Sequence, residues 1–347
     1  MNLSNQPAPA SGLPQHVPIA ATYRGGHPEN LHFGSFAVVS ASGEVLASAG
    51  DIDFPTFTRS ALKPFQSTPL IARAAEHYAL DDADIALLCA SHSGEPMHTE
   101  RVASLLARIG AGEAALACGT HEPYFFRSLG LTPEPGARFN RLQHNCSGKH
   151  TGMLMLAHAL GQPLAGYLDL GHPVQQAIVD CVAHFSGLAP ERLVRGIDGC
   201  SAPNYALPLR ALAQAFARLT LDAPDAVYGD TPRRVARAMS RHPELVSGQK
   251  RNDLVLMTAG RGDWVSKVGA DGVQAMASFS RGVGIAAKVS DGNLTPLMVA
   301  LVAALEQLGW TDGASRAALA GLLPPPMKNA AGIEVGEMRA VLTLQHL

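Results

Sequence analysis

Short runs in which apolar residues alternate with small or polar ones occur near both ends of the chain. Two pairs of runs are separated by the turn signals Ser42-Gly43 and Asp271-Gly272, and an Asp-Gly pair is typical of a tight hairpin. The pattern predicts strands over residues 36–40, 45–49, 264–268, 273–279, 284–289 and 333–344. We therefore expect a sheet to which both chain ends contribute.

Between these runs the apolar residues follow a helical period. Pro64 places the start of a helix over residues 60–75 near Ser60, because proline is tolerated only in a first turn. Thr295 is expected to cap a helix that runs from Pro296 to about residue 308. Further helices are predicted over residues 99–109, 149–160, 173–185, 207–219 and 232–241, and residues 110–145 are expected to be irregular.

These elements predict an α/β fold, with one mixed sheet formed from both chain ends and a helical insert. The 347 residues contain no repeat and no long linker, so we expect a single catalytic domain over residues 19–347. Its sheet part would span about 19–60 and 255–347, and its helical part about 61–254. Residues 1–18 are rich in Pro, Ser, Ala and Gln, which predicts a mobile tail and not a signal peptide.

Composition narrows the class of protein. A hydrophobic fraction of 47% with 16% charged residues provides a sizeable core and argues against disorder. The net charge of −2 and the lack of a basic cluster argue against nucleic-acid binding. Five irregularly spaced cysteines do not form a disulfide framework, which favours a reducing, cytoplasmic location. The longest clean apolar run, 297–305, is too short to cross a membrane.

Ser60 and Lys63 are the first candidates for chemistry. Three residues apart on a helix, they share a face, and a lysine kept neutral by burial or by a second cation can take the proton of a serine. Penicillin-recognising enzymes use this arrangement. The same spacing is common at a plain helix start, with the serine as a cap and the lysine in solvent.

Two further segments could border a pocket. Ser91 lies in a small polar run, 89–95, that follows an apolar stretch and can also be a capped turn. Lys267 precedes Val268 and Gly269 on a predicted strand, a position comparable to the Lys-(Thr/Ser)-Gly strand of the penicillin-recognising fold. It can equally be a strand lysine that points to water.

A third group of candidates contains cysteine. Cys146 lies close to Lys149 and His150, and could be a thiolate nucleophile with His150 as base, a metal ligand, or a buried thiol. The backbone amides near it could also bind an anion at a helix start. Cys200, two residues after Asp198, could complete a metal site with Cys146, although two ligands alone do not define one.

Eight short motifs occur in a single order along the chain, and together they resemble the asparaginase II family, the rhizobial-type third structural class of L-asparaginases. Each motif alone is modest, but the resemblance extends from about residue 20 to near the C-terminus. The motifs lie at residues 24–30, 59–64, 89–93, 145–153, 198–200, 241–244, 267–271 and 288–293.

The resemblance implies a fold similar to that of serine β-lactamases and glutaminases, a homodimer, and L-asparagine as the small-molecule substrate. It also implies two Ser–Lys pairs at the reaction centre, which map onto Ser60 with Lys63 and onto Ser91 with Lys267. In the reaction that we expect, Ser60 attacks the side-chain amide and Lys63 accepts its proton.

The resemblance further implies a zinc ion (Zn2+) beside the active site, with water completing its coordination shell. The ligands map onto Cys146, Lys149 and Cys200; a lysine ligand is unusual because its amine must be neutral. Asp198 matches a residue that contacts the site. The candidate substrate-binding residues are Asp198 for the ammonium, Arg24 for the carboxylate, on its charge alone, and His150.

Four alternatives stay open at this point. A glutaminase would use the same chemistry on a substrate one methylene longer. A penicillin-recognising serine hydrolase would use the same Ser–Lys arrangement. A Cys–His amidase would depend on Cys146 and His150. A non-catalytic, zinc-stabilised protein would bind the amino acid without releasing ammonia.

Overall fold

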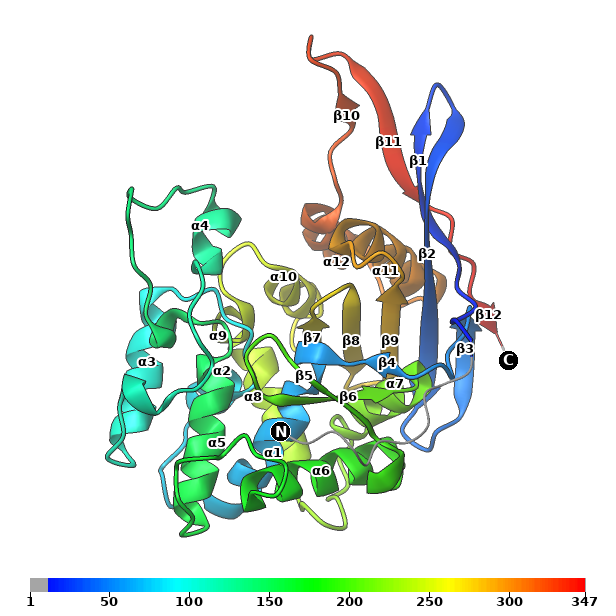
Figure 1. The fold of residues 1–347 in the computed structure, drawn as a ribbon. Coiled ribbons are helices and arrows are strands. Elements are labelled where there is room, and N and C mark those ends of the chain that lie inside the picture. Colours follow the sequence, from blue (N-terminus) through cyan, green and yellow to red (C-terminus); the bar gives the residue numbers. More distant parts are fainter. Residues whose placement is uncertain (1–11, 347) are drawn as a thin grey trace.

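The computed structural model describes residues 12–346, and its centre is a nine-stranded sheet with helices on both faces (Figure 1). The strand order is β10-β11-β1-β2-β9-β8-β7, with β3 beside β2 and β12 beside β3. The strands are β1 (Val17–Arg24), β2 (His27–Ser40), β3 (Val45–Ala49), β7 (Trp264–Gly269), β8 (Val273–Ser278), β9 (Val283–Val289), β10 (Met327–Lys328), β11 (Glu334–Ala340) and β12 (Gln345–His346).

Both chain ends contribute to this sheet, as predicted. The hairpins β2–β3 and β7–β8 form where the turn signals predict them, with Val38 opposite Ala47 and Trp264 opposite Ser278. The predicted mixed pairing is wrong, because every ladder within the described residues is antiparallel. Short turns account for the antiparallel pairs of consecutive strands, since parallel neighbours need long crossover connections, whereas the pairs β2–β9, β1–β11 and β3–β12 join segments far apart in the chain.

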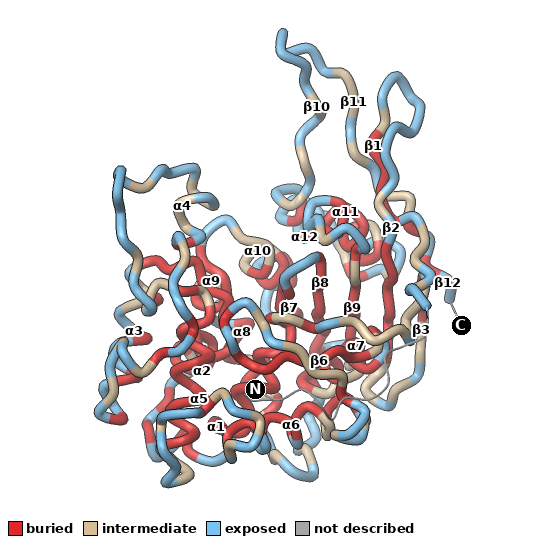
Figure 2. The backbone as a smooth tube through the Cα atoms, viewed as in Figure 1, coloured by how far each residue is buried: buried red, intermediate tan, exposed pale blue. Residues whose placement is uncertain are grey.

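Alternate residues of the central strands enter two separate cores. Phe36 and Val38 of β2 belong to the core that contains α11 (Leu294–Gln307), whereas Ala37 and Val39 belong to the core that contains α7 (Leu209–Arg218). This is the two-residue period of a strand buried on both faces. Figure 2 shows these central strands in red, the colour of buried residues.

The segment between the two sheet portions is mainly helical, and the predicted helices are confirmed to within a few residues. A small sheet, β4-β6-β5, was missed; it consists of β4 (Thr56–Phe57), β6 (Pro203–Leu207) and β5 (Val194–Ile197). The remaining helices are α1 (Lys63–Ala74), α2 (Asp82–Leu88), α3 (Pro96–Ala107), α4 (Tyr124–Leu129), α5 (Ser147–Ala159), α6 (Pro173–Ser186), α8 (Thr231–Arg241), α9 (Pro243–Ser247), α10 (Asn252–Ala259) and α12 (Gly313–Leu319).

Three boundaries differ from the prediction. A 3-10 turn over Arg59–Leu62 precedes α1, so the α-helix itself begins at Lys63, with Pro64 in its first turn as expected. Asn293, and not Thr295, caps α11, because its side chain accepts a hydrogen bond of 3.0 Å from the backbone N–H of Thr295. The predicted mobile tail lies largely outside the described residues, and β1 already begins at Val17.

Strands β1 and β2 extend beyond the body of the protein together with β10 and β11, as an exposed arm (Figures 1 and 2). Gly25 and Gly26 form the β1–β2 turn with φ of 56° and 82°, the left-handed geometry that suits a two-residue hairpin loop. No helix in residues 12–346 is long and apolar enough to cross a membrane.

Gly284 on β9 allows the closest approach between the sheet and α7. A Cβ atom added there would lie 2.0 Å from the backbone oxygen of Ala213. Replacing Gly284 by Ala is therefore expected to lower the free energy of unfolding by about 1–3 kcal/mol through overpacking, as measured by urea denaturation. In the control Gly313→Ala, where no atom lies within 4 Å, the change should stay within about 0.5 kcal/mol. Equal stability of the two variants would show that β9 and α7 are not packed this closely.

Candidate active site

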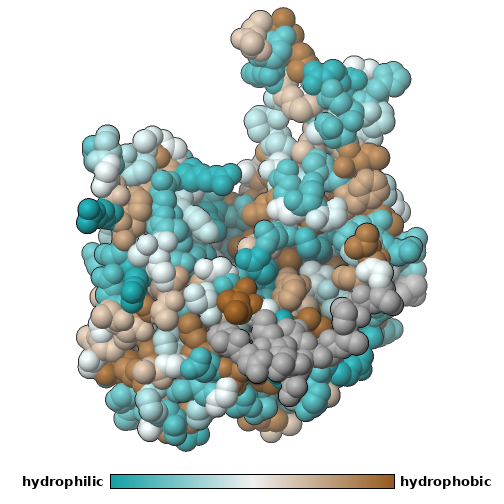
Figure 3. Space-filling model, viewed as in Figure 1, coloured by the Kyte–Doolittle hydropathy of each residue, from teal (hydrophilic) through white to brown (hydrophobic). Residues whose placement is uncertain are grey.

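A cavity of about 490 Å³ contains both predicted serines. Its walls come from the small polar turns before α1 and after α2, from α4, from the start of α10 and from the end of β7. Figure 3 shows the surface hollowed between the α4 segment and the arm, where hydrophilic side chains predominate. The cavity is lined by Ser60, Ser91, Tyr124, Arg127, Ser128, Asn145, Ser247, Lys250, Arg251, Asn252, Asp253, Val268, Gly269, Ala270 and Leu294.

Ser60 is presented by a strained backbone. Arg59, immediately before it, has a φ of 49°, which is uncommon for a residue other than glycine. The side-chain amide of Asn204 on β6 holds this conformation, because it accepts from the Arg59 N–H (3.1 Å) and donates to the Arg59 carbonyl (3.0 Å). Ser60 is 8% exposed, and within residues 12–346 its hydroxyl makes no hydrogen bond. Ser60 is thus a largely buried residue that is held at the wall of the cavity.

Lys63 begins α1, three residues after Ser60, and is fully buried. Its Nζ donates to the carbonyl of Ala90 (2.5 Å), to the hydroxyl of Ser91 (2.9 Å) and to the carbonyl of Asn145 (3.4 Å). Burial lowers the pKa of Lys63; the thiol of Cys146 opposes this shift. A lysine in this environment loses its proton more readily than one in water.

The observed hydrogen bonds differ from the pairing that the family resemblance implies. Lys63 bonds to Ser91 and not to Ser60, although both serines line the same cavity. Ser91 is further fixed by its backbone, because its N–H donates to Val246 (2.9 Å) and its carbonyl accepts from Arg251 (2.7 Å). One serine is therefore held rigidly against a lysine, and the other has its hydroxyl unengaged.

Lys267 is buried in a second polar cluster, beside Asp253 of α10. Its Nζ lies 3.4 Å from Asp253 Oδ2 and donates to the carbonyl of Val268 (3.0 Å). The same carboxylate accepts from the N–H of Val268 (2.9 Å), from Ser266 (2.8 Å) and from Gln274 (3.1 Å). Burial lowers the pKa of Lys267 to about 8, with Asp253 opposing the shift and Lys63 and Arg251 adding to it.

The predicted zinc ligands come together at the start of α5. Lys149 Nζ donates to Cys200 Sγ (2.8 Å), and the neighbouring thiols of Cys146 and Cys200 shift each other's pKa, which falls for Cys146 and rises for Cys200. In the described chain no group of three or more His, Cys, Asp and Glu side chains is placed to hold a metal. The candidate site has two thiols and one lysine amine, so it contains only two side chains of those types. Its two soft sulfur donors nevertheless suit zinc. Zinc could therefore be held here only once Lys149 gives up its proton; burial favours this loss, but the thiols of Cys200 and Cys146 outweigh burial and raise the pKa of Lys149.

His150 is fully buried behind this cluster and does not line the cavity. Its Nδ1 bonds to the Tyr167 hydroxyl (2.6 Å), and its buried Nε2 has no hydrogen-bond partner among residues 12–346. Burial lowers its pKa to about 4. Among the described residues no hydrogen bond joins the Cys146 thiol to the His150 ring, so the geometry of a Cys146–His150 nucleophile pair is not formed here.

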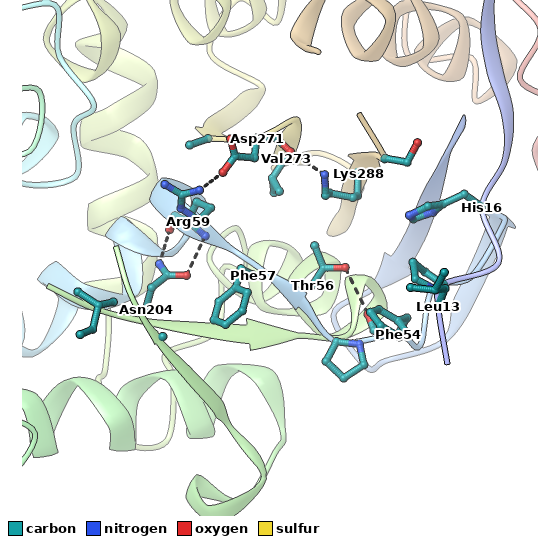
Figure 4. A pocket seen from close by; sticks show the side chains of 16 residues that line it. Leu13, His16, Phe54, Thr56, Phe57, Arg59, Asn204, Asp271, Val273 and Lys288 are labelled. Atoms are coloured by element: carbon teal, nitrogen blue, oxygen red, sulfur yellow. Dashed lines mark hydrogen bonds and ion pairs between the residues drawn. The ribbon is translucent and has the colours of Figure 1, made fainter. Parts of the chain in front are cut away.

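Asp198 lies in the turn between β5 and β6, and Arg59 Nε donates to it at 2.8 Å. Arg59 also pairs with Asp271. Both residues line a second, larger cavity of about 670 Å³ (Figure 4). The lining of this cavity includes neither Ser60 nor Ser91. We therefore take the smaller cavity as the candidate active site, although it is not the largest.

Arg24 is the predicted residue that lies farthest from this arrangement. It ends β1 at the tip of the arm, pairs with Glu29 at 2.9 Å and has a side chain that is 52% exposed. Two residues that do lie close to the serines, Arg251 and Asp253, were not predicted from the sequence. Charged residues at a helix start such as α10 are common, so the local sequence contains no signal that distinguishes them.

The comparisons with solved structures show only distant similarity. Mglu in its native form at 4.3 M NaCl is 16% identical over 81% of this chain and 62% of its own, with a TM-score of 0.46. A β-lactamase (Mb2281c) from Mycobacterium bovis is 14% identical over 84% and 95%, with a TM-score of 0.36. EstCE1, a hydrolase with promiscuous acyltransferase activity, is 11% identical over 78% and 93%, with a TM-score of 0.40. The chain thus spans about three fifths of the length of Mglu.

No curated protein sequence matches this chain significantly. The family comparison is different, because the model of the L-asparaginase II family matches residues 20–340, which is nearly the whole chain. This range includes both serines, the three buried lysines Lys63, Lys149 and Lys267, and the two cysteines of the thiol cluster. The chain therefore belongs to the L-asparaginase II family.

Proposed function

We propose that this protein is an L-asparaginase that hydrolyses L-asparagine to L-aspartate and ammonia through a serine nucleophile assisted by lysine. The observation that carries the proposal is the 2.9 Å hydrogen bond from the buried Lys63 amine to Ser91, with Ser60 in the same cavity. Membership of the family supports amide hydrolysis as the reaction class. Glutamine is the second candidate substrate, because the same groups would act on its amide.

In the proposed reaction, the Ser60 oxygen forms a bond to the amide carbon, and its proton passes to a neutral Lys63. The tetrahedral intermediate collapses as the C–N bond breaks, and ammonia leaves with the proton from Lys63. Water then attacks the acyl ester, and aspartate departs as the Ser60 hydroxyl regains a proton. Ser91, which accepts a hydrogen bond from Lys63, and the neutral amine of Lys267 serve as the proton relay, and burial favours the neutral form of Lys63.

We further propose that Cys146, Lys149 and Cys200 hold a zinc ion. A bound zinc would cross-link the start of α5 to the turn between β5 and β6, and so fix two walls near the cavity. The homodimer and the cytoplasmic location expected from the sequence stay predictions.

Replacing Ser60 by Ala is expected to reduce ammonia release from L-asparagine by a factor on the order of 10⁴ or more, because the nucleophile is lost. Ser91→Ala should retain acyl-enzyme formation, which mass spectrometry of acid-quenched enzyme would detect on Ser60. An acyl group that still forms in Ser60→Ala would move the nucleophile to Ser91 or Cys146.

The relay role of Lys267 predicts a pH dependence. A neutral Lys267 amine is required, so kcat should rise with pH through about 8. In Asp253→Asn the carboxylate that stabilises the ammonium is removed, the pKa of Lys267 falls further, and the acid limb of the kcat profile should move to lower pH. The control Ser266→Ala removes one hydrogen bond to the same carboxylate and keeps its charge. A loss of rate in Asp253→Asn without a shift of the limb would contradict the relay.

Removal of zinc by a chelator is expected to raise KM for asparagine with little change in kcat, because the ion would hold the walls and take no part in bond breaking. Metal content measured before and after chelation establishes the loading. If chelation abolished turnover at saturating asparagine while KM was unchanged, this structural role would be wrong.

A further inference from the structure

Arg251 is a cation in the cavity wall that lacks an acidic partner. Within the described residues no carboxylate lies within ion-pair distance of it. The nearest acids are engaged elsewhere: Asp253 accepts four hydrogen bonds, and Glu95 accepts from Ser93 (2.5 Å) and from the N–H of Gln249 (3.1 Å). A partly buried charge without a counter-ion is unfavourable unless a ligand supplies one.

The guanidinium of Arg251 is nevertheless held in a fixed position. Nη1 donates to the carbonyls of Ser91 (2.7 Å) and Ser247 (3.3 Å), and the group lies over the ring of Tyr124, 4.9 Å from its centroid. These contacts use Nη1 and the face of the guanidinium. Among residues 12–346, Nε and Nη2 have no protein acceptor, so the two donors that bind a carboxylate side by side stay available.

The position of Arg251 also suits the proposed reaction. It lines the same cavity as Ser60, and its Nη1 bonds to the backbone of Ser91, so a group bound by Arg251 lies next to the serines. Two further cations, Arg127 and Lys250, line this cavity but are exposed. Three cations and one carboxylate, Asp253, line the cavity, so it presents net positive charge to a ligand.

We infer that Arg251 is the anchor for the substrate carboxylate, and that it restricts this enzyme to amides that also bear a carboxylate group. The inference rests on the proposed amidohydrolase function and names its substrate class. It replaces Arg24, which lies at the tip of the arm, as the candidate for this role. Burial also lowers the pKa of Arg251, which a bound carboxylate would counteract.

The test compares L-asparagine with 3-aminopropanamide, which lacks only the α-carboxylate. Wild type should show a much higher kcat/KM for asparagine. In Arg251→Gln this preference should fall about 10- to 100-fold, the usual weight of charge-assisted hydrogen bonds. The matched control Lys250→Gln removes a neighbouring exposed cation from the same cavity, and should keep the preference within about twofold.

Because Arg251 also supports the backbone of Ser91, absolute rates alone do not decide the question. If Arg251→Gln slowed both amides by the same factor, the residue would be a support for Ser91, and the inference would be overturned. Should Arg251→Gln fail to fold, Arg251→Lys retains the charge but not the two parallel donors, and its preference should still fall.

A binding measurement separates this inference from the proposed function. L-Aspartate should raise the melting temperature of wild type, and this increase should be largely lost in Arg251→Lys but kept in Lys250→Gln. If wild type releases no ammonia from either amide, the proposed function fails, and the melting temperatures alone decide whether the anchor stands. An equal effect of L-aspartate on all three proteins would refute the anchor even if asparagine is hydrolysed.

Discussion

The buried amine of Lys63 connects three segments that are far apart in the chain. It begins α1, and it donates to the loop after α2 and to the residue before the thiol cluster of α5. Removing an amine completely from water is costly, and no carboxylate lies within ion-pair distance of it in the described chain. The surrounding carbonyls offset part of that cost. They also fix the distance between the two serine loops, so the geometry of the cavity depends on this one side chain.

The fold could be predicted from the sequence wherever one period continued over many residues. The amphipathic pattern located α3, α6 and α8, and the Asp271-Gly272 signal located the β7–β8 hairpin. The small sheet escaped prediction, because β4 has two residues, β5 has four, and such short runs show no clear alternation. The pairing of the whole sheet as antiparallel depends on long-range contacts that periodicity does not encode.

The candidate site could be predicted in part. The residues of the motifs do converge, since Ser60 and Ser91 share one cavity and Cys146 contacts Cys200. The bond from Lys63 to Ser91 joins residues 28 positions apart, which no spacing argument predicts. Arg251 and Asp253 stand in an unremarkable helix start. Their importance depends on their surroundings in the folded protein. Arg251 has no acidic partner among the described residues, and Asp253 accepts four hydrogen bonds.

The amide clamp of Asn204 on Arg59 has a consequence for the response of this protein to ionic strength. Both of its hydrogen bonds join neutral groups, so dissolved salt does not screen them, and the strained turn before Ser60 should keep its shape in concentrated salt. The field of the cations around the cavity has no such protection, because Arg127 and Lys250 face solvent. High salt would therefore weaken the attraction of this cavity for an anion such as the product L-aspartate, while the arrangement of the nucleophile would persist.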